Sequence, residues 1–522
     1  MKQVYVVLLI STFSIGQNIE IFHEDGEFIM DENIKLIVSN VNINSYQDLQ
    51  SFDSLKVNLN NAKYTFIVVP KKLEYGPQYL VHLNSVIYKL YFSKMPLINI
   101  YVSDTIADDP KTQGLLILSD TIDAELVTSY CGIEFRGGYT QSFPKKSYDI
   151  ELWEDKDGHH NNDETLLNMR DDDDWILIGM YNEPLRLRNV VSHEIWSKIH
   201  IPYYIKEEEE AKAGINTQYV ELAINNEYLG VYALCEQVDR KQLKLAEFTT
   251  SMRGELYKAF TWGTPTYSDL PPFNNAENTW GGFELKYPKA TDYIDWENLY
   301  DWIDFVMYSE NTDFQKSIED KFVINNAADY FILINLIQAK DNTGKNTFIA
   351  KYKEDEPYFY VPWDLDGVLG NSYTGEESDK YDDILLNFLY ERLLDPNNGL
   401  FNSQLANRWF ELRNSLLNEA ELISLIEKNY LRLLVNGNYE REALKWSNKA
   451  INISNLNYTY TWLYSRIQFL DDYFSSNIFT NVSSPNRLEK TIDILGRETN
   501  SNQGFQLHIY DDGSVEKKYV IK

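Results

Sequence analysis

Two groups of polar residues at the ends of apolar stretches have the residue types that phosphoryl transfer requires. Residues 338–350 read QAKDNTGKNTFIA, in which Asp341 and Asn346 lie five positions apart between the apolar runs ADYFILINLI and TFIAKY. In phosphoryl transfer a carboxylate orients the attacking hydroxyl, and a nearby amide oxygen helps to hold Mg²⁺. Asp and Asn are also common in turns and Gly344 suits a left-handed backbone, so this loop alone favours a plain turn.

A second group follows 23 residues after Asp341, where VPWDLDGVLG places Asp364 and Asp366 at the end of an apolar strand. Charged carboxylates beside the apolar Pro362 and Trp363 are costly unless a cation neutralises them. A kinase places its metal-binding Asp on the strand that follows the catalytic loop, which matches this order. An exposed turn is the competing interpretation, and it applies to Asp366 more than to Asp364.

A third group lies upstream, where EFRGGYTQSFPKKSYDIELW contains a glycine pair and then Lys145 and Lys146. Backbone amides beside glycines can cradle phosphates, and a lysine ammonium supplies a point charge for them. A glycine-rich turn with two lysines is common in proteins, so this stretch is weak support when it is taken alone.

The elements that must position these residues follow from the hydrophobic pattern. Residues 18–95 alternate short β-branched and aromatic runs with polar turns, which predicts a small β module. The stretch YVELAINNEYLGVYALCE predicts two strands joined by an Asn-Asn turn, and LRLRNVVSHEIWSKI and NAADYFILINLIQ predict helices. Residues 262–282 are rich in Pro, Gly and Asn and predict an irregular loop. Residues 381–475 are almost wholly helical by pattern.

Length and charge narrow the class of protein. The chain has 522 residues, beyond the roughly 250 to 300 at which one core stops growing, so we expect one large domain with smaller modules. The 48 Lys and Arg against 79 Asp and Glu give a formal charge of -31, which argues against a nucleic acid partner. After the first residues, no stretch approaches the roughly 20 apolar residues of a transmembrane helix, so we expect no transmembrane segment in the mature chain.

The cysteines and the first residues bear on where the protein works. Cys131 and Cys235 lie in apolar strand-like runs without metal-binding spacing, so buried free thiols are expected. A disulfide between them requires the two strands to lie side by side. Residues 1–17, with Lys2 before an apolar run, fit a secretory signal peptide cleaved near Gly16 or Gln17, the alternative being a buried first strand.

Several stretches together carry a resemblance to a known family. They are RGGYTQSFPKKSYDIELWEDKDG, DDDDWILIGMYNEPLRLRNVVSHEI, YVELAINNEYLGVYALCEQVDR, GELYKAF, AADYFILINLIQAKDNTGKN and YFYVPWDLDGVLG. In order and spacing they are similar to the spore-coat protein H (CotH) kinase family over about residues 95–475. The resemblance implies an α+β fold, a divergent protein kinase with a mixed β lobe and a helical lobe, over residues 96–476. It also implies a protein that binds ATP and Mg²⁺ (or Mn²⁺) and phosphorylates Ser or Thr of a protein substrate.

The resemblance assigns roles to the residues already singled out. Asp341 becomes the catalytic Asp, Asp364 the metal-binding Asp, and Asn346 a metal ligand, with Asp366 as a further candidate ligand. Lys146 becomes the phosphate-contacting lysine.

Further positions match the family on the nucleotide side of the site. Lys145 is a close second to Lys146, because the motif does not say which lysine points inward. Glu194, in the helix predicted at RNVVSHEIW, could pair with that lysine as the αC glutamate of kinases does, and an exposed helix residue is the alternative. Arg136 and Arg188 could be phosphate contacts or structural ion pairs.

The segment ALCEQVD lies where a nucleotide base would meet the hinge, which makes Glu236 and Gln237 candidate contacts. The chain departs from the family in having Gly138 and Tyr139 where Asn or Ser is usual after Arg-Gly, and Gln237 where a Lys is frequent. These departures keep a second function open, that of a surface adhesin or enzyme-complex component that retains the fold without turnover.

The end of the chain shows a second resemblance. Residues 477–488 form a polar linker, and residues 489–522 are similar to the C-terminal sorting domain of type IX secretion, a small β module read by an outer-membrane export machine. The resemblance implies a protein secreted or held on the surface of a Gram-negative bacterium, with the secretion machinery as a partner. A terminal β hairpin that docks on the preceding helices is the alternative.

Overall fold

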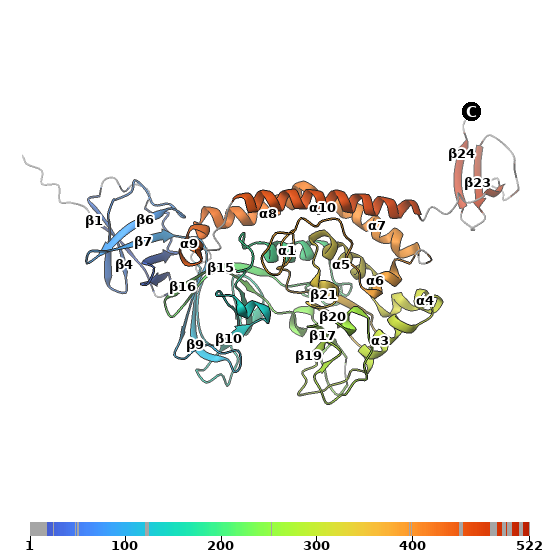
Figure 1. Cartoon of the computed structure of the whole chain (residues 1–522), viewed down its shortest axis with the longest axis horizontal. Coiled ribbons are helices and arrows are strands. Elements are labelled where there is room, and N and C mark those ends of the chain that lie inside the picture. Colours follow the sequence, from blue (N-terminus) through green and yellow to red (C-terminus); the bar gives the residue numbers. More distant parts are fainter. Residues whose placement is uncertain are drawn as a thin grey trace, which may run out of the picture.

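The computed structural model of the chain is seen in Figure 1. It describes residues 18–480 apart from gaps at 25, 47–48, 50–51, 121–124, 252, 396, 398 and 448–452, and then residues 488–492, 497, 499, 504–510 and 515–520. The expected signal peptide at residues 1–17 lies outside the described residues. Several β-sheets, one of them closed into a barrel, are combined with a helical segment, which is the α+β class that the sequence predicts.

The first sheet has seven strands in the order β1-β4-β5-β6-β7-β3-β2. Its strands alternate in burial: in β4 the side chains of Leu55, Val57 and Leu59 are buried and those between them are half-buried, so one face packs on a core. The sheet is tied to the barrel, because the backbone N–H of Tyr228 donates to the Asp31 carboxylate at 3.0 Å. The strands are β1 (Asn18–Phe22), β2 (Phe28–Asp31), β3 (Leu36–Ser39), β4 (Ser54–Leu59), β5 (Ala62–Phe66), β6 (Gln78–Leu83) and β7 (Val86–Phe92).

The second sheet closes into a barrel in the order β10-β11-β14-β16-β15-β8-β9. Its hairpin β15–β16 turns at Asn225 and Asn226, both with positive φ, so the predicted Asn-Asn turn is confirmed. Closure leaves no exposed strand edge, a feature that the local sequence pattern does not reveal. The strands are β8 (Leu97–Val102), β9 (Thr112–Asp120), β10 (Glu125–Arg136), β11 (Ser147–Trp153), β14 (Asp174–Ile178), β15 (Thr217–Ile224) and β16 (Glu227–Cys235).

The cysteines lie on barrel strands that are not neighbours. Cys131 is on β10 and Cys235 on β16, and strands β11 and β14 lie between them in the barrel. Both are buried free thiols, as the sequence predicts, and burial raises the pKa of the Cys131 thiol to about 12. A disulfide between Cys131 and Cys235 is therefore excluded, because it requires their strands to be neighbours.

A third, antiparallel sheet has the order β18-β19-β17-β20-β21. Strand β20 begins directly after the KDNTGKN loop, and β21 ends directly before Trp363. Since β20 and β21 pair with Thr347 opposite Pro362, the end of that loop and the start of WDLD lie side by side. The strands are β17 (Glu255–Ala259), β18 (Thr279–Trp280), β19 (Phe283–Tyr287), β20 (Thr347–Lys351) and β21 (Tyr358–Pro362).

Helix α5 is the centre of the largest core. It spans Ile324–Ile337, and all its residues from Asn326 onward are buried, as expected for a helix packed on every side. The cap residue Gln338 has a left-handed backbone (φ 57°), and its N–H bonds to the last turn of the helix. The KDNTGKN loop begins two residues later. Figure 1 shows α8 and α10 lying along one side of the molecule. The other helices of the described residues are α1 (Arg188–Ile199), α2 (Arg240–Leu243), α3 (Glu297–Tyr308), α4 (Asn311–Lys321), α6 (Phe388–Leu393), α7 (Gly399–Arg413), α8 (Glu419–Val435), α9 (Asn438–Lys445) and α10 (Ile453–Thr480).

The segment predicted as helical from residue 381 begins with a non-helical stretch, residues 381–387. Its backbone is held by other partners: the Asn335 side chain accepts from Leu385 N at 2.8 Å, and Arg466 donates to the carbonyls of Tyr381 and Asp383. These tertiary bonds replace the bonds of a helical turn, so the helical prediction is wrong for these seven residues.

The remaining elements are short. Within the described residues they are the turns η1 (Tyr139–Ser142), η2 (Thr264–Thr266) and η3 (Asp341–Thr343), the strand pair β12 (Glu164–Thr165) and β13 (Asp171–Asp172), and a C-terminal antiparallel sheet of β22 (Leu488–Ile492), β23 (Gly504–Tyr510) and β24 (Val515–Val520). Among the described residues, no helix combines the length and the apolar character that crossing a membrane requires.

Candidate functional site

The pairing of β20 with β21 brings the two acidic motifs together. The N–H of Trp363 donates to the carbonyl of Asn346 at 3.0 Å, and the N–H of Asn346 donates to the carbonyl of Ala259 on β17 at 2.9 Å. Asn346 and Asp364 both have left-handed backbones, with φ of 53° and 55°. A left-handed Asp is costly and tends to persist where the surrounding structure imposes it, which is common at functional sites.

The interior of the KDNTGKN loop is structural. Asn342 is buried, and its side-chain amide donates to the carbonyls of Asn346 at 2.6 Å and Trp363 at 2.9 Å. At Gly344 a Cβ would run into Thr266 and Trp262. The turn interpretation is therefore right for the middle of the loop, while Asp341 and Asn346 at its two ends are left to line a cavity.

Replacing Asn342 by Ala is expected to lower the free energy of unfolding by about 1–3 kcal/mol, because the buried carbonyl of Trp363 loses the Asn342 amide and the carbonyl of Asn346 keeps the N–H of Trp363 but loses a second donor. Guanidinium denaturation measures the change. Thr343→Ala is the matched control, since the Thr343 hydroxyl bonds only to Lys340 within its own turn, and it should change stability by less than about 0.5 kcal/mol. Equal losses for the two variants would contradict the structural role given to Asn342.

The cavity has a volume of about 630 Å³ and lies between the barrel and the third sheet. Of the residues predicted from the sequence, it brings together Arg136, Lys145, Gln237, Asp341, Asn346, Asp364 and Asp366. It does not include Lys146, Glu194, Arg188 or Glu236. Its wall also carries three lysines that the sequence did not single out, Lys258, Lys286 and Lys345.

The carboxyl groups of Asp364 and Asp366 lie where the protein supplies too little positive charge to keep both ionised. Burial in the cavity wall raises the pKa of Asp364, although Lys258 and Arg136 act against the rise. Burial together with the charge of Asp364 raises the pKa of Asp366 to about 8. Asp366 is held in place by the amide of Asn182, which donates to its Oδ2 at 2.7 Å.

These residues fit a divalent cation. Two carboxylates and the amide oxygen of Asn346 form the kind of oxygen donor set that Mg²⁺ prefers. The raised pKa values of both carboxyl groups show that a positive charge placed between them would be favourable. Asp341 differs from them in having its own cation, since its Oδ2 is 2.9 Å from Lys345 Nζ.

Positive side chains line the same cavity, close enough to Asp364 to act on its charge. Arg136, at the end of β10, pairs with Asp149 at 2.5 Å and lies over the Trp363 ring at 5.3 Å. Lys258 lies on β17, and burial and the charges of Arg136 and Lys286 lower its pKa. Cations that repel one another in this way are relieved by an anionic ligand, and phosphate groups are such a ligand.

The two lysines of the PKK motif differ in direction. The side chain of Lys145 is wholly buried on the cavity side, 2.6 Å from Glu442 Oε1. Lys146 instead donates to the carbonyl of Gln141 at 2.5 Å and lies beside the Phe135 ring. The choice of Lys146 over Lys145 as the inward lysine is therefore wrong, because Lys145 and not Lys146 lines the cavity.

The predicted lysine partner Glu194 lies elsewhere. It faces α8, where Asn429 donates to its Oε1 at 3.4 Å and Lys428 Nζ is 4.0 Å from its Oε2. Its pairing with Lys146 is wrong, because its carboxylate lies against Asn429 and Lys428 of α8. Arg188 at the start of α1 is buried, 2.8 Å from Glu183 and 2.8 Å from the Thr459 hydroxyl. Of the two roles predicted for it, phosphate contact or structural ion pair, it has the ion pair.

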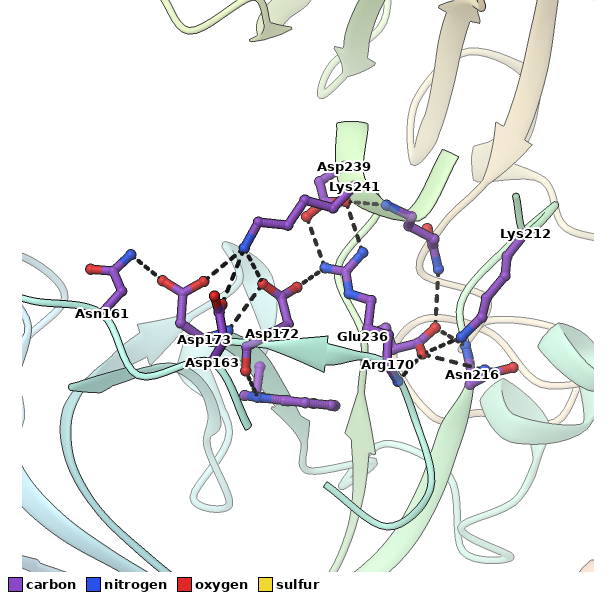
Figure 2. A network of polar contacts seen from close by, with 12 residues as sticks. Asn161, Asp163, Arg170, Asp172, Asp173, Lys212, Asn216, Glu236, Asp239 and Lys241 are labelled. Atoms are coloured by element: carbon purple, nitrogen blue, oxygen red, sulfur yellow. Dashed lines mark hydrogen bonds and ion pairs between the residues drawn. The ribbon is translucent and has the colours of Figure 1, made fainter. Parts of the chain in front are cut away.

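The segment after β16 divides between the cavity and the interior. Gln237 lines the cavity, whereas the side chain of Glu236 points into a polar network. Figure 2 shows Glu236 among Lys212, Asn216 and Arg170, with Lys212 Nζ 2.8 Å from its Oε1. Glu236 is thus poorly placed to contact a nucleotide base. Its carboxylate instead accepts from the backbone N–H groups of Arg170 and Asn216 beside the segment that carries Gln237.

Two acidic clusters lie away from the cavity. In each of them, at least three Asp, Glu, His or Cys side chains have possible metal-ligand atoms within 4.8 Å of one another, and the described part of the chain holds no other such group. Asp163, Asp172 and Asp173 already surround the ammonium of Lys241, which is 2.8 Å from Asp172 (Figure 2). The other cluster, Asp155, Asp157 and His159, is on the surface. Neither cluster shares a residue with the cavity.

Sequence reasoning missed three kinds of residue in the site. Lys258 had a signal, because a lysine within the apolar strand GELYKAF is unusual unless it faces a ligand. Asn182 and Glu442 had none, since each acts through a partner that is distant along the chain.

Comparison with known proteins bears on what this cavity belongs to. No curated protein matches the chain. The family model described as CotH kinase protein matches residues 133–475, a span that carries Arg136, Lys145, Asp341 and Asp364 and is more than half of the 522-residue chain. That match confirms the family resemblance seen in the sequence and implies a kinase-like fold. The chain belongs to the CotH kinase family.

Proposed function

We propose that the protein is an exported atypical kinase that transfers the γ-phosphoryl group of ATP to Ser or Thr hydroxyls of a protein substrate, with Mg²⁺ or Mn²⁺. The supporting observation is the composition of the cavity. It places the cations Arg136, Lys258 and Lys286 and the carboxyl groups of Asp364 and Asp366, whose charge the protein compensates only in part, in one space of about 630 Å³. A nucleotide polyphosphate with a divalent cation complements both sets of charges.

In this proposal Asp341 is the catalytic base. The acceptor hydroxyl oxygen forms a bond to the γ-phosphorus, the bond from that phosphorus to the β,γ-bridging oxygen breaks, and Asp341 accepts the hydroxyl proton while ADP leaves. Lys345, 2.9 Å from Asp341 Oδ2, stands where it can stabilise charge on the transferring group.

The nucleotide is held by the remaining residues. Asp364, Asp366 and Asn346 hold the metal, which supplies positive charge to the phosphate oxygens. Arg136, Lys145 and Lys258 contact the phosphates, and Gln237 lies at the base end of the cavity.

The alternative is a surface adhesin or complex component without turnover. That role would be favoured by an Asp364 turned away from the loop or by a site filled with an aromatic ring. Here Asp364 lines the cavity with Asp341, Asn346 and Lys258, and about 630 Å³ of space remains beside the Trp363 ring. This arrangement favours the kinase.

Export is the second part of the proposal. It rests on the signal-peptide pattern at residues 1–17 and on the sorting-domain resemblance at residues 489–522, where the described strands β22, β23 and β24 form one sheet. Deleting residues 489–522 is expected to leave the protein in the periplasm of a type IX-competent host. Unchanged delivery to the cell surface would overturn the assignment of the tail.

Calorimetry tests nucleotide binding directly. Titration of the full chain with ATP is expected to give saturable binding with Mg²⁺ and much weaker binding with EDTA, because Asp364 and Asp366 then face the phosphates without a cation between them. At 100 times Kd, Mg-ATP should stabilise the fold by about 2.7 kcal/mol in thermal unfolding. Absence of binding with both Mg²⁺ and Mn²⁺ would contradict the proposal.

A further inference from the structure

A glutamate from the helical segment reaches the buried lysine of the cavity. Glu442 is on α9, 297 residues after Lys145, and its Oε1 accepts from Lys145 Nζ at 2.6 Å. The same oxygen accepts from the backbone N–H of Val231 on β16, also at 2.6 Å. The exposed fraction of the side chain is 0% for Lys145 and 5% for Glu442, so the pair is shielded from solvent.

The barrel is shaped to admit this glutamate. Gly230 on β16 has a φ of 92°, and a Cβ at that position would lie against the Glu442 carboxylate. Gly230 therefore serves two needs that another residue could not meet together: the left-handed backbone and the close approach of Glu442 to the strand.

Glu442 also connects the lysine to the metal side of the cavity. Its Oε2 accepts from Arg186 at 3.3 Å, and Arg186 donates to the carbonyls of Met180 at 2.6 Å and Tyr181 at 3.2 Å. The next residue of that segment, Asn182, donates to Asp366. Arg186 thus fixes the backbone of residues 180–181, and the adjacent Asn182 holds Asp366, so Glu442 is tied through this segment to the metal side of the cavity.

We infer that Glu442 is the positioning residue that keeps Lys145 charged and aimed at the nucleotide phosphates, the task for which Glu194 was predicted. The inference rests on the proposed kinase function. A lysine ammonium has three donors, and Lys145 directs one to Val231 O at 2.6 Å and one to Glu442, while the residue itself lines the cavity. Without a negative partner a lysine this deeply buried loses its proton, and with it the attraction for phosphate.

The charged and titratable groups that face Lys145 come from three elements. They are Glu442 on α9, Arg186 and Glu183 in the segment before α1, and Tyr232 on β16, whose ring is 4.7 Å from Nζ. Burial lowers the pKa of Lys145 to about 8, and Glu442 acts against this fall. Burial by itself would raise the pKa of Glu442, but Lys145 and Arg186 hold it below its usual value. Removing the Glu442 charge therefore lowers the pKa of Lys145 further.

The test is Glu442→Gln in the full chain. Gln can still accept from Lys145 and Val231 but has no charge, so the KM for ATP at neutral pH should rise about 10- to 100-fold. The alkaline limb of the pH profile of kcat/KM should move down by roughly one pH unit or more, because the cation is lost at lower pH. Glu442→Asp, which keeps the charge, should move the limb less.

Arg441→Lys is the matched control on the same helix. Arg441 anchors α9 to Glu221 at 2.6 Å and does not contact Lys145, so this variant should lower the melting temperature and leave the alkaline limb unchanged. A limb that stays in place in Glu442→Gln, or that moves equally in Arg441→Lys, would overturn the inference.

A measurement without ATP separates this inference from the proposed function. The pH dependence of the ¹³Cε chemical shift of Lys145, in protein labelled at lysine, reports the pKa of its amine without needing a reagent to reach it. The midpoint should fall in Glu442→Gln, and an unchanged midpoint would overturn the pairing. If the midpoint falls in Glu442→Gln while the wild-type protein neither binds nor turns over ATP, the pairing is supported and the kinase function is rejected.

Discussion

Replacing Asp364 by Asn is expected to abolish detectable Mg-ATP binding and to lower phosphoryl transfer about 100- to 1,000-fold. Asp364 is the carboxylate that faces Asp366 and the cations Lys258 and Arg136 in one cavity. In the proposed site Asp364 would hold the metal that supplies positive charge to the phosphates, and losing a metal ligand would remove several kcal/mol of charge stabilisation from the transition state.

Calorimetry and initial rates measure this effect, with Asp382→Asn as the control. Asp382 is an exposed aspartate outside the cavity, so the same chemical change there should leave binding and rate within about twofold of wild type. Mg-ATP affinity in Asp364→Asn equal to that of wild type would remove Asp364 from the metal site.

Replacing Asp341 by Asn is expected to separate binding from turnover. Asp341 has its own ion pair with Lys345, and it is proposed to contact the acceptor hydroxyl and not the nucleotide. We therefore expect the Kd for Mg-ATP to stay within about threefold and kcat to fall about 100- to 10,000-fold, the range for loss of a general base.

By this account, Asp364→Asn must lose Mg-ATP binding and Asp341→Asn must lose only the rate of the chemical step. Isothermal titration gives the Kd, and single-turnover transfer gives the rate of the chemical step in each protein. A loss of Mg-ATP binding in Asp341→Asn as large as that in Asp364→Asn would show that Asp341 is a metal ligand and not the base.

The sequence predicts most clearly those features that neighbouring residues decide. The helix at NAADYFILINLIQ and the Asn225-Asn226 hairpin follow from local periodicity and turn chemistry, and both are present. Closure of the barrel depends on β8 pairing with β15, more than 100 residues away in the chain, and no local pattern encodes that contact. The local pattern predicts helix at residues 381–387, and this prediction is wrong because the bonds to Asn335 and Arg466 that hold these residues are also non-local.

The same distinction holds in the candidate site. Asp341, Asn346 and Asp364 could be grouped because the loop and the two strands that bring them together are consecutive, and a hairpin pairing such as Thr347 with Pro362 is easily anticipated. The choice of Lys146 over Lys145 is wrong because one residue of register decides which side chain points inward, and the PKK motif does not encode that register.

Glu442, the partner of Lys145, could not be predicted from the sequence for a related reason. Fold analogy placed the lysine's partner on the helix after the lysine, at Glu194, whereas the structure supplies Glu442 from the helical segment through an opening left by Gly230. Which helix delivers a buried charge depends on tertiary packing alone.

The most direct test of the central claim is transfer of labelled γ-phosphate from ATP to protein Ser or Thr, in the presence of Mg²⁺ or Mn²⁺, by wild type, Asp341→Asn and Asp364→Asn. We predict transfer by the wild-type protein, including transfer to its own Ser or Thr residues where no other acceptor is supplied, and transfer at least about 100-fold slower by each variant. Transfer by both variants at the wild-type rate, or no transfer by wild type with either metal, would contradict the account.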